Sequence, residues 1–387
     1  MSGIADHRAI RPSGYLPTLD GWRAIAILGV MICHASDGLF QTGGIYPNSQ
    51  LRAIAGHGAL GVDIFFGISG FLICSCLLAE HRQNGVINLK RFYVRRFFRI
   101  LPPYMTYLAG LLILAVLGLV TISPSAWWSC LLFFRNYLPD ESGGTFYTGH
   151  FWSLAVEEHF YLIWPGLLVL AGIPRARRVV VALAGMVAVW RVWEFRHQWL
   201  AQLIPAFSNC RWDWRTDIRL DGLLWGCWMA LLLGDTVWRE RLTRWLSPPV
   251  WIGLVASFVA CTYYKPPLAW TWQSILIVLI LAGTVLRPQT LAGLILESPP
   301  LRWVGRMSYS LYLWNSLFFP GMGYPRPLPL GNLQALPINV FLVFAFASLS
   351  YHFVERPLIR LGHSLASSTS PKTKESLREG HLTARAA

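Results

Sequence analysis

The feature that most constrains this chain is a succession of long apolar runs. Hydrophobic residues fill 54% of the 387 positions and charged residues only 13%, whereas about a quarter of an ordinary soluble domain is charged. A hydrocarbon core of about 30 Å takes roughly 20 helical residues to cross, and ten runs approach that length. They lie at residues 22–40, 59–79, 101–121, 151–172, 178–194, 220–237, 248–264, 268–286, 303–320 and 336–354. The sequence therefore predicts an all-α, polytopic membrane bundle of about ten transmembrane helices.

Positive charge predicts the orientation of this bundle. With the N-terminus inside, the cytoplasmic segments hold 24 of the 33 lysines and arginines, as the excess of these residues in cytoplasmic loops requires. An even number of spans then places both termini in the cytoplasm. The bias accounts for the net charge of +14, so the expected partner is the lipid bilayer and no nucleic acid is expected.

Three parts of the chain are expected. Residues 1–18 form a polar cytoplasmic segment, residues 19–361 the transmembrane domain, and residues 362–387 a polar tail, low in aromatic residues, that is expected to be disordered. No small-residue cleavage pattern follows the first apolar run, so no cleavable signal is expected. The seven cysteines show neither CxxC nor metal-ligand spacing, so no metal site is expected.

Two ionisable residues share one face of the first span, "LDGWRAIAILGVMICHA". Eleven steps of about 100° bring His34 to within about 20° of the face that carries Arg23, and about 16 Å deeper. Ionisable groups in hydrocarbon are costly, so a polar cavity is the expected surrounding. There His34 can act in proton transfer. The alternative is a histidine that bonds between helices and an arginine that reaches the headgroups.

A basic cluster occurs in "LKRFYVRRFFRILPPY", at the expected cytoplasmic face. Arg95 and Arg99 lie four residues apart and Arg96 and Arg99 three apart, so their guanidinium groups are neighbours on a helix. Guanidinium forks suit phosphate oxygens, which predicts a site for a phosphate-bearing ligand. The alternative is that membrane topology alone supplies basic residues at a cytoplasmic helix end.

The stretch "GHFWSLAVEEHFYLIWP" carries polar groups into a span. Ser153, Glu157 and Tyr161 recur every four residues and therefore line one helix face. Exposing all three polar side chains to lipid would cost free energy. We expect this face to line a cavity. Glu158 can instead pair with a cation outside the membrane, such as Arg135.

Other polar groups form a weaker set. The stretches "IRLDGLLWG" and "GRMSYSLYLWN" contribute Arg219 and Tyr309, and Trp152 lies beside Ser153. Aromatic residues fit interfacial belts first and a platform for sugars second. The stretch "GISGF" lacks the last glycine of a hydrolase elbow, so its small residues, Gly67 to Gly70, are expected to allow close helix packing.

Together these stretches resemble the membrane acyltransferase-3 family of bacterial carbohydrate O-acyltransferases. The resemblance runs in order along almost the whole chain, through Arg23 and His34, "GVDIFFGISGFL", "FYVRRFFRILPPY", "HFWSLAVEEHFYLIWP", "RLDGLLWG", "SYSLYLWN" and "ERP". One departure is Asn315, where the family often has histidine, so an acid-base role there is expected to be lost.

The resemblance implies a multi-pass protein of the bacterial inner membrane that moves an acyl group, most often acetyl, from cytoplasmic acyl-CoA to a carbohydrate or glycolipid hydroxyl. No permanently bound cofactor is implied, because acyl-CoA is a substrate. His34, Arg23 and Glu157 are then the candidate catalytic residues, with His34 as general base or acyl carrier. The candidate donor-binding residues are Arg95, Arg96 and Arg99. The candidate substrate-binding residues are Trp152, Ser153, Tyr161, Arg219 and Tyr309.

Two other classes of function fit the same residues. The first is a transporter or flippase for an anionic lipid-linked sugar, which would yield no acylated product; the absence of a visible internal repeat counts against it. The second is a sensor or scaffold whose buried polar groups only fix helix packing.

Overall fold

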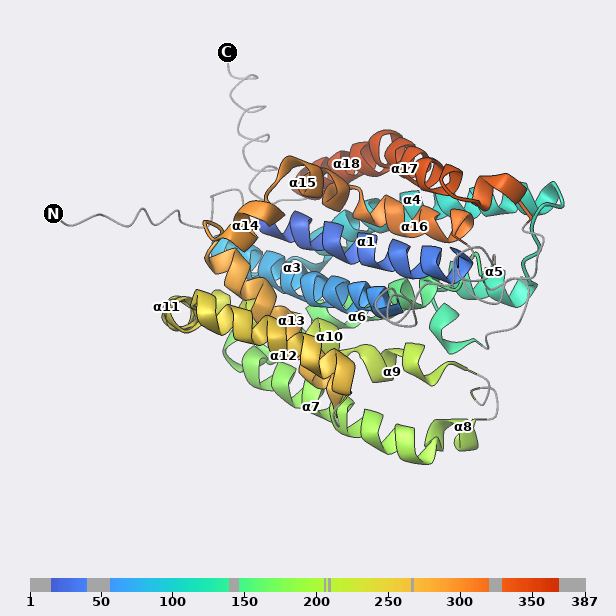
Figure 1. Ribbon diagram of the computed structural model, residues 1–387. Helices are drawn as coiled ribbons and strands as arrows, with labels where there is room; N and C mark the ends of the chain where they lie inside the picture. Colours follow the sequence, from blue (N-terminus) through green and yellow to red (C-terminus); the bar gives the residue numbers. More distant parts are fainter. Residues whose placement is uncertain are drawn as a thin grey trace, which may run out of the picture.

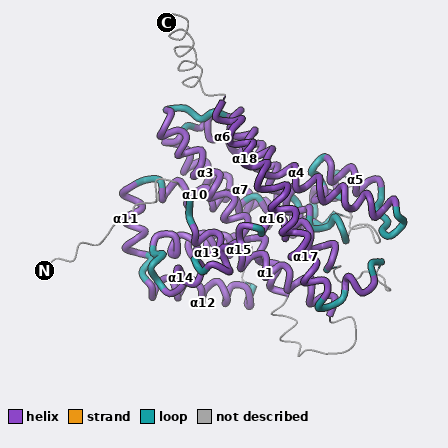
Figure 2. The backbone as a smooth tube through the Cα atoms, turned by 90° about the horizontal axis from the view of Figure 1, so that it is seen from above, coloured by secondary structure: helices purple, strands orange, loops and turns teal. Residues whose placement is uncertain are grey.

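The computed structural model describes residues 15–39, 56–138, 146–204, 207, 210–265, 268–319 and 329–368. Within these ranges the chain is helical and has no β-strand (Figures 1 and 2). The main helices are α1 (Pro17–Leu39), α3 (Gly61–Asn84), α4 (Leu89–Val116), α6 (Phe151–Ala171), α7 (Ile173–His197), α10 (Asp221–Leu233), α12 (Pro248–Tyr264), α13 (Ala269–Leu286), α16 (Ser308–Phe318) and α17 (Ile338–Ser350). Short elements connect them: α5 (Pro124–Leu131), α8 (Trp199–Leu203), α9 (Thr216–Arg219), α11 (Thr236–Trp245), α14 (Leu291–Leu296), α15 (Pro299–Arg306), α18 (Arg356–Ser368), the 3₁₀ turns η1 (His57–Leu60), η2 (Arg135–Tyr137), η4 (Trp212–Trp214) and η5 (Gly331–Gln334), and the π-helical turn η6 (Tyr351–Glu355).

Each of the ten predicted spans overlaps one or two helices, but fewer helices are long and apolar enough to cross a membrane on their own. Five described helices meet that requirement, and a sixth does if the bent pair α11 and α12, which meet at 80°, counts as one span. The five are His57–Asn84, Leu89–Val116, Phe151–Ala171, Ala269–Leu286 and Ile338–Ser367. At two predicted spans, 220–237 and 303–320, the main helix is too short to cross, because α10 has 13 residues and α16 has 11. The all-helical fold is confirmed, and the number of ten spans stays a prediction.

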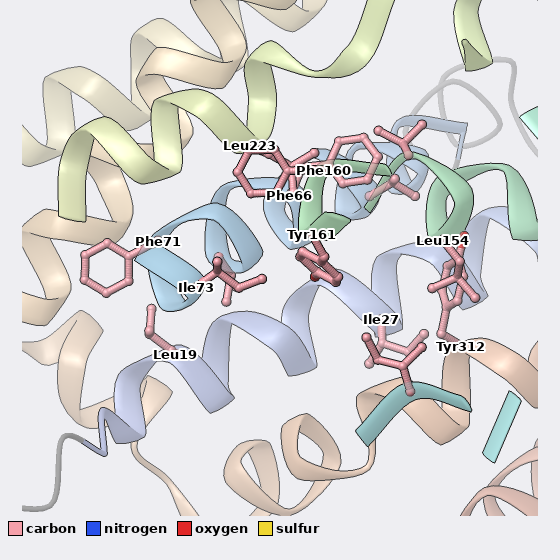
Figure 3. Close-up of a cluster of buried hydrophobic side chains, with 14 of the residues drawn as sticks. Leu19, Ile27, Phe66, Phe71, Ile73, Leu154, Phe160, Tyr161, Leu223 and Tyr312 are labelled. Atoms are coloured by element: carbon pink, nitrogen blue, oxygen red, sulfur yellow. The ribbon is translucent and has the colours of Figure 1, made fainter. Parts of the chain in front are cut away.

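Helix α1 lies between α3 on one side and α16 on the other in the view of Figure 1, and it contacts both. Side chains from several helices fill the space around it: Figure 3 shows Leu19 and Ile27 of α1 together with Ile73 of α3 and Tyr161 of α6. All four side chains are buried. The part of α1 that carries Leu19 and Ile27 is thereby covered by protein, whereas other residues of the helix, such as Ile32, are exposed.

The small residues of the "GISGF" stretch allow α3 and α10 to pack closely, as predicted. A Cβ atom on Gly70 would collide with the backbone of Leu223, and one on Gly226 would collide with the carbonyl group of Gly67. Only glycine permits this approach of two helix backbones.

The connections predicted to be cytoplasmic meet at one end of the bundle. Arg91 donates to the carbonyl of Ala366 at 2.9 Å, and Arg82 donates to that of Gly234 at 2.5 Å. The other contacts at this end join Arg177 to Asp235 at 3.5 Å, Arg287 to the carbonyl of Thr243 at 2.5 Å, and Arg302 to the Tyr15 hydroxyl at 3.4 Å. The opposite end joins segments predicted to lie outside, for example through Asn136 and Thr216 at 2.9 Å. Gly234 and Asp235 fall inside the predicted span 220–237, and the orientation of the chain in the membrane stays a prediction.

The predicted domain boundary at residue 361 falls inside α18, which continues to Ser368. Gly362 lies so close to Phe98 that a Cβ atom on it would come within 2.6 Å of the Phe98 Cβ, and this close approach and the Arg91 bond to Ala366 tie the helix to α4. The first residues of the expected tail thus belong to the bundle. Residues 1–14 and 369–387 lie outside the described ranges.

Candidate functional site

A cavity lies among α1, α3, α4, α6 and α16. Most of its polar lining comes from residues far apart in the sequence. The polar and charged residues are Arg23, Ser69, Arg96, Arg99, Ser153, Glu157, Glu158, Tyr161, Arg306, Ser308, Tyr309, Tyr312 and Glu355. The apolar residues are Val62, Phe65, Phe66, Leu72, Ile100 and Leu154.

Arginines gather at the end of the cavity that is nearer the predicted cytoplasmic connections. Arg23 projects from α1, Arg96 and Arg99 from α4, and Arg306 from the end of α15. The Arg96 guanidinium lies 5.1 Å from the centre of the Tyr161 ring and 5.7 Å from that of Phe92, which fixes its position by cation–π contact. In the described part of the chain, none of the four arginines is within 4.0 Å of a carboxylate oxygen. Glu355 of η6 also lines the cavity and is near enough to Arg99 and Arg23 for their charges to interact, so positive charge exceeds negative charge at this end.

Glu157 stands deeper in the cavity and is held by two neutral donors. The hydroxyl of Ser69 donates to one carboxylate oxygen at 2.9 Å, and that of Tyr161 donates to the other at 3.1 Å. Glu158 also lines the cavity, rather than turning outward to Arg135. The hydrogen bonds orient Glu157 while leaving it able to accept further bonds, because each carboxylate oxygen has more than one acceptor site.

The inner end of the cavity is formed by Ser153 and Tyr312. Their hydroxyls are 2.6 Å apart, and the Tyr312 hydroxyl also donates to the carbonyl of His150 at 2.8 Å. Tyr309, one turn before Tyr312, donates to the carbonyl of Ile100 at 2.9 Å. These bonds tie α16 to the beginning of α6 and to α4.

His34 does not line the cavity but lies beyond its inner end. Its Nδ1 is 2.6 Å from Oδ1 of Asn315, and Asn315 follows Tyr312 by one turn on α16. The face of α1 that carries both residues therefore has two different environments. Arg23 faces the cationic end of the cavity, and His34 contacts α16 further along the bundle.

Three other predicted residues have partners outside the cavity. Arg95 forms a 3.0 Å salt bridge with the buried Glu80. Arg219 forms one of 2.6 Å with Asp63 and lies over the Trp152 ring, 5.4 Å from its centre. Trp152 also stacks in parallel on Trp214, with 5.6 Å between ring centres. These contacts bind Arg95, Trp152 and Arg219 into the protein itself.

Sequence reasoning thus placed seven of its candidates on one cavity and missed several others. The seven are Arg23, Arg96, Arg99, Ser153, Glu157, Tyr161 and Tyr309. Among the residues it did not select are Ser69, Arg306, Tyr312 and Glu355. Tyr312 shares a helix face with Tyr309 by its spacing of three, which is a signal that the sequence contains. Glu355, which accepts a bond from Ser310 at 2.7 Å, belongs to the "ERP" stretch, although its partner on another helix could not be predicted from spacing.

Comparison with known proteins identifies one matching family model and several similar proteins. Residues 16–352 match the family model described as "Acyltransferase domain". Over 379 residues the chain is 27% identical to the peptidoglycan O-acetyltransferase OatA of Listeria monocytogenes, covering 90% of this chain and 56% of that protein. Over 376 residues it is 29% identical to YrhL of Bacillus subtilis, which is named a putative peptidoglycan O-acetyltransferase. That match covers 89% of this chain and 55% of YrhL. The chain thus spans little more than half the length of these relatives. No solved structure matches it.

Proposed function

We propose that this chain, which belongs to the acyltransferase-3 family, transfers an acyl group, acetyl in the first instance, from cytoplasmic acyl-CoA to a carbohydrate hydroxyl. The acceptor is a surface polysaccharide or its lipid-linked precursor. The name of the Listeria relative, peptidoglycan O-acetyltransferase, supports a glycan acceptor. The observation that carries the proposal is the cavity with arginines at one end and an oriented carboxylate within.

The donor is held at the cationic end. Arg23, Arg96 and Arg99 have no carboxylate partner within the described ranges, so their charge is available to phosphate groups, which guanidinium binds in bidentate fashion. Arg95 differs because Glu80 already neutralises it. In acyl-CoA a long flexible arm joins the phosphates to the thioester, so phosphates bound at this end allow the acyl group to extend inward.

The transfer itself forms one bond and breaks another. The acceptor oxygen bonds to the thioester carbonyl carbon, the bond from that carbon to sulfur breaks, and the hydroxyl proton passes to His34 and then to the departing thiolate. Glu157 binds acceptor hydroxyls in the cavity. Because His34 lies beyond Tyr312, the acyl group has to pass this side chain. Transient acylation of His34 is the second route, in which its ring nitrogen attacks the thioester first.

The proposed setting is the bacterial inner membrane, with all ten runs crossing and both termini in the cytoplasm. Contacts between predicted cytoplasmic segments at one end of the bundle support this topology, for example Arg91 with Ala366 and Arg287 with Thr243. Labelling of single cysteines introduced into these loops tests it: they are expected to react only when the reagent reaches the cytoplasmic face.

The test of function uses inside-out membrane vesicles from cells that lack this gene, supplied with acetyl-CoA labelled in the acetyl group. Complementation with wild type is expected to incorporate label into glycan, and complementation with His34→Ala at equal protein level is expected not to. Arg99→Gln is expected to raise the KM for acetyl-CoA by about tenfold or more, as befits the loss of a hydrogen bond to a charged group, about 1.5–3 kcal/mol.

Arg95→Gln is the matched control, since Arg95 is already paired with Glu80, and its KM is expected to stay within about twofold of wild type. Equal labelling by wild type and His34→Ala would remove His34 from the reaction. If vesicles move an anionic lipid-linked sugar across the membrane and form no acylated product, the protein is a transporter.

A further inference from the structure

Asn315 makes two hydrogen bonds whose directions are coupled. It is completely buried, its Nδ2 donates to the backbone carbonyl of Tyr312 at 2.5 Å, and its Oδ1 is 2.6 Å from Nδ1 of His34. The sequence alone predicted only that this position lacks an acid-base group. The structure instead brings it into direct contact with the candidate catalytic histidine.

The backbone carbonyl of Tyr312 fixes which way the Asn315 amide faces. A carbonyl oxygen only accepts hydrogen bonds, so the NH₂ end of the amide has to face it, and the amide oxygen is then turned to His34. An amide oxygen also only accepts, so the hydrogen in the bond to His34 belongs to the histidine. A neutral imidazole carries one N–H, and Nδ1 therefore holds it.

We propose that Asn315 is a positioning residue that keeps neutral His34 in the Nδ1–H form, so that Nε2 is the nitrogen that takes the proton or the acyl group. This inference rests on the proposed function for the role of His34, but the tautomer itself does not depend on it. A base held in one tautomer by a buried acceptor needs no rearrangement before it takes a proton, which is how an orienting side chain assists a catalytic histidine.

Asn315 is also well placed to hold the ring still. Its helix is anchored at Tyr312, whose hydroxyl bonds Ser153 and the carbonyl of His150. His150 is near enough to His34 for a proton on one ring to disfavour a proton on the other, and a neutral amide, unlike a carboxylate, adds no charge to this pair. The bond to Asn315 thus orients His34 without altering the balance of charge around it.

The first measurement is the tautomer of His34 in the full-length protein in lipid, by nitrogen-15 NMR of labelled histidine at pH 8, with His34→Gln to identify the signal. We expect wild type to show a protonated Nδ1 and a lone pair on Nε2. In Asn315→Leu we expect this preference to be lost, and in Asn315→Asp, which keeps an acceptor oxygen, we expect it to remain. A wild-type signal with the proton on Nε2 overturns the proposal, as does an unchanged tautomer in Asn315→Leu.

The second measurement is acyl transfer by the same variants. Asn315→Leu is expected to lower kcat by about 10- to 100-fold, part of the 10²–10⁴ that general base catalysis supplies, with the KM for acetyl-CoA within about twofold of wild type. The matched control is Asn339→Leu, which removes another buried amide, one that bonds the carbonyl of Gln334; it is expected to change neither the tautomer nor kcat. If Asn315→Leu alters the tautomer and kcat stays the same, Asn315 is not a positioning residue. If His34→Ala retains full transfer, the proposed function of His34 fails, and the NMR result still decides the tautomer.

Discussion

The buried ion pair between Glu194 of α7 and Arg215, the residue before α9, gives the sharpest test of how these segments are held together. Oε1 of Glu194 accepts from Arg215 at 2.6 Å, and both side chains are 2% exposed. Its Oε2 accepts from the backbone N–H of Leu200 at 3.2 Å. Glu194→Gln keeps the shape but removes the charge, and breaking a buried pair costs about 3–5 kcal/mol. Arg215 retains Asp217 at 2.5 Å, so we expect the lower end, about 3 kcal/mol.

The assay is equilibrium unfolding by SDS in mild detergent micelles, followed by tryptophan fluorescence. A loss of about 3 kcal/mol lowers the ratio of folded to unfolded protein by about 150-fold, since about 1.4 kcal/mol is a factor of ten. Glu240→Gln changes an exposed glutamate on α11 and is the matched control, expected within about 0.5 kcal/mol of wild type. Unfolding of Glu194→Gln at the same SDS fraction as Glu240→Gln would refute the argument that this pair holds α7 to α9.

The same unfolding assay checks two further predictions. Gly70→Ala is expected to lose about 1–3 kcal/mol, because its Cβ would meet the Leu223 backbone, whereas Gly166→Ala, with no atom within 4 Å of its Cβ, is the control and is expected to lose none. Asp235→Ala is expected to cost about 1 kcal/mol, because its side chain caps α11. Arg177→Ala is expected to cost less, because its ion pair with Asp235 is exposed to solvent; an equal loss in both would mean that the ion pair and not the cap stabilises this end.

Hydropathy predicted the helices well where one apolar run forms one helix. The runs at 151–172 and 248–264 correspond to α6 and α12 almost residue for residue. It failed where the backbone turns inside an apolar stretch: the predicted span 303–320 is divided at Met307 between α15 and α16. Averaging over a window of residues does not register a helix cap or a change of direction, so span lengths were overestimated there.

Helical periodicity predicted part of the site for a similar reason. The spacing of Ser153, Glu157 and Tyr161 depends only on one helix, and all three line the cavity. Arg95 and Arg219 instead form salt bridges with residues of another helix. Arg95 pairs with Glu80 of α3, and Arg219 pairs with Asp63 of α3. Spacing along one helix gives no information on which partner a charge meets across the bundle, so the sequence could not predict these two ion pairs.

The order of charges along the cavity bears on the choice between transfer and transport. Four arginines and Glu355 occupy one end, Glu157 and Glu158 stand deeper, and neutral hydroxyls of Ser153 and Tyr312 form the inner end. An anion that enters at the arginines is attracted there and is repelled by the carboxylates beyond them. A carrier of an anionic sugar has to move its cargo past those carboxylates, whereas an acyltransferase has to move only an uncharged acyl group inward while the phosphates stay behind. The cavity therefore favours a donor that is held by its charged end and reacts at its neutral end.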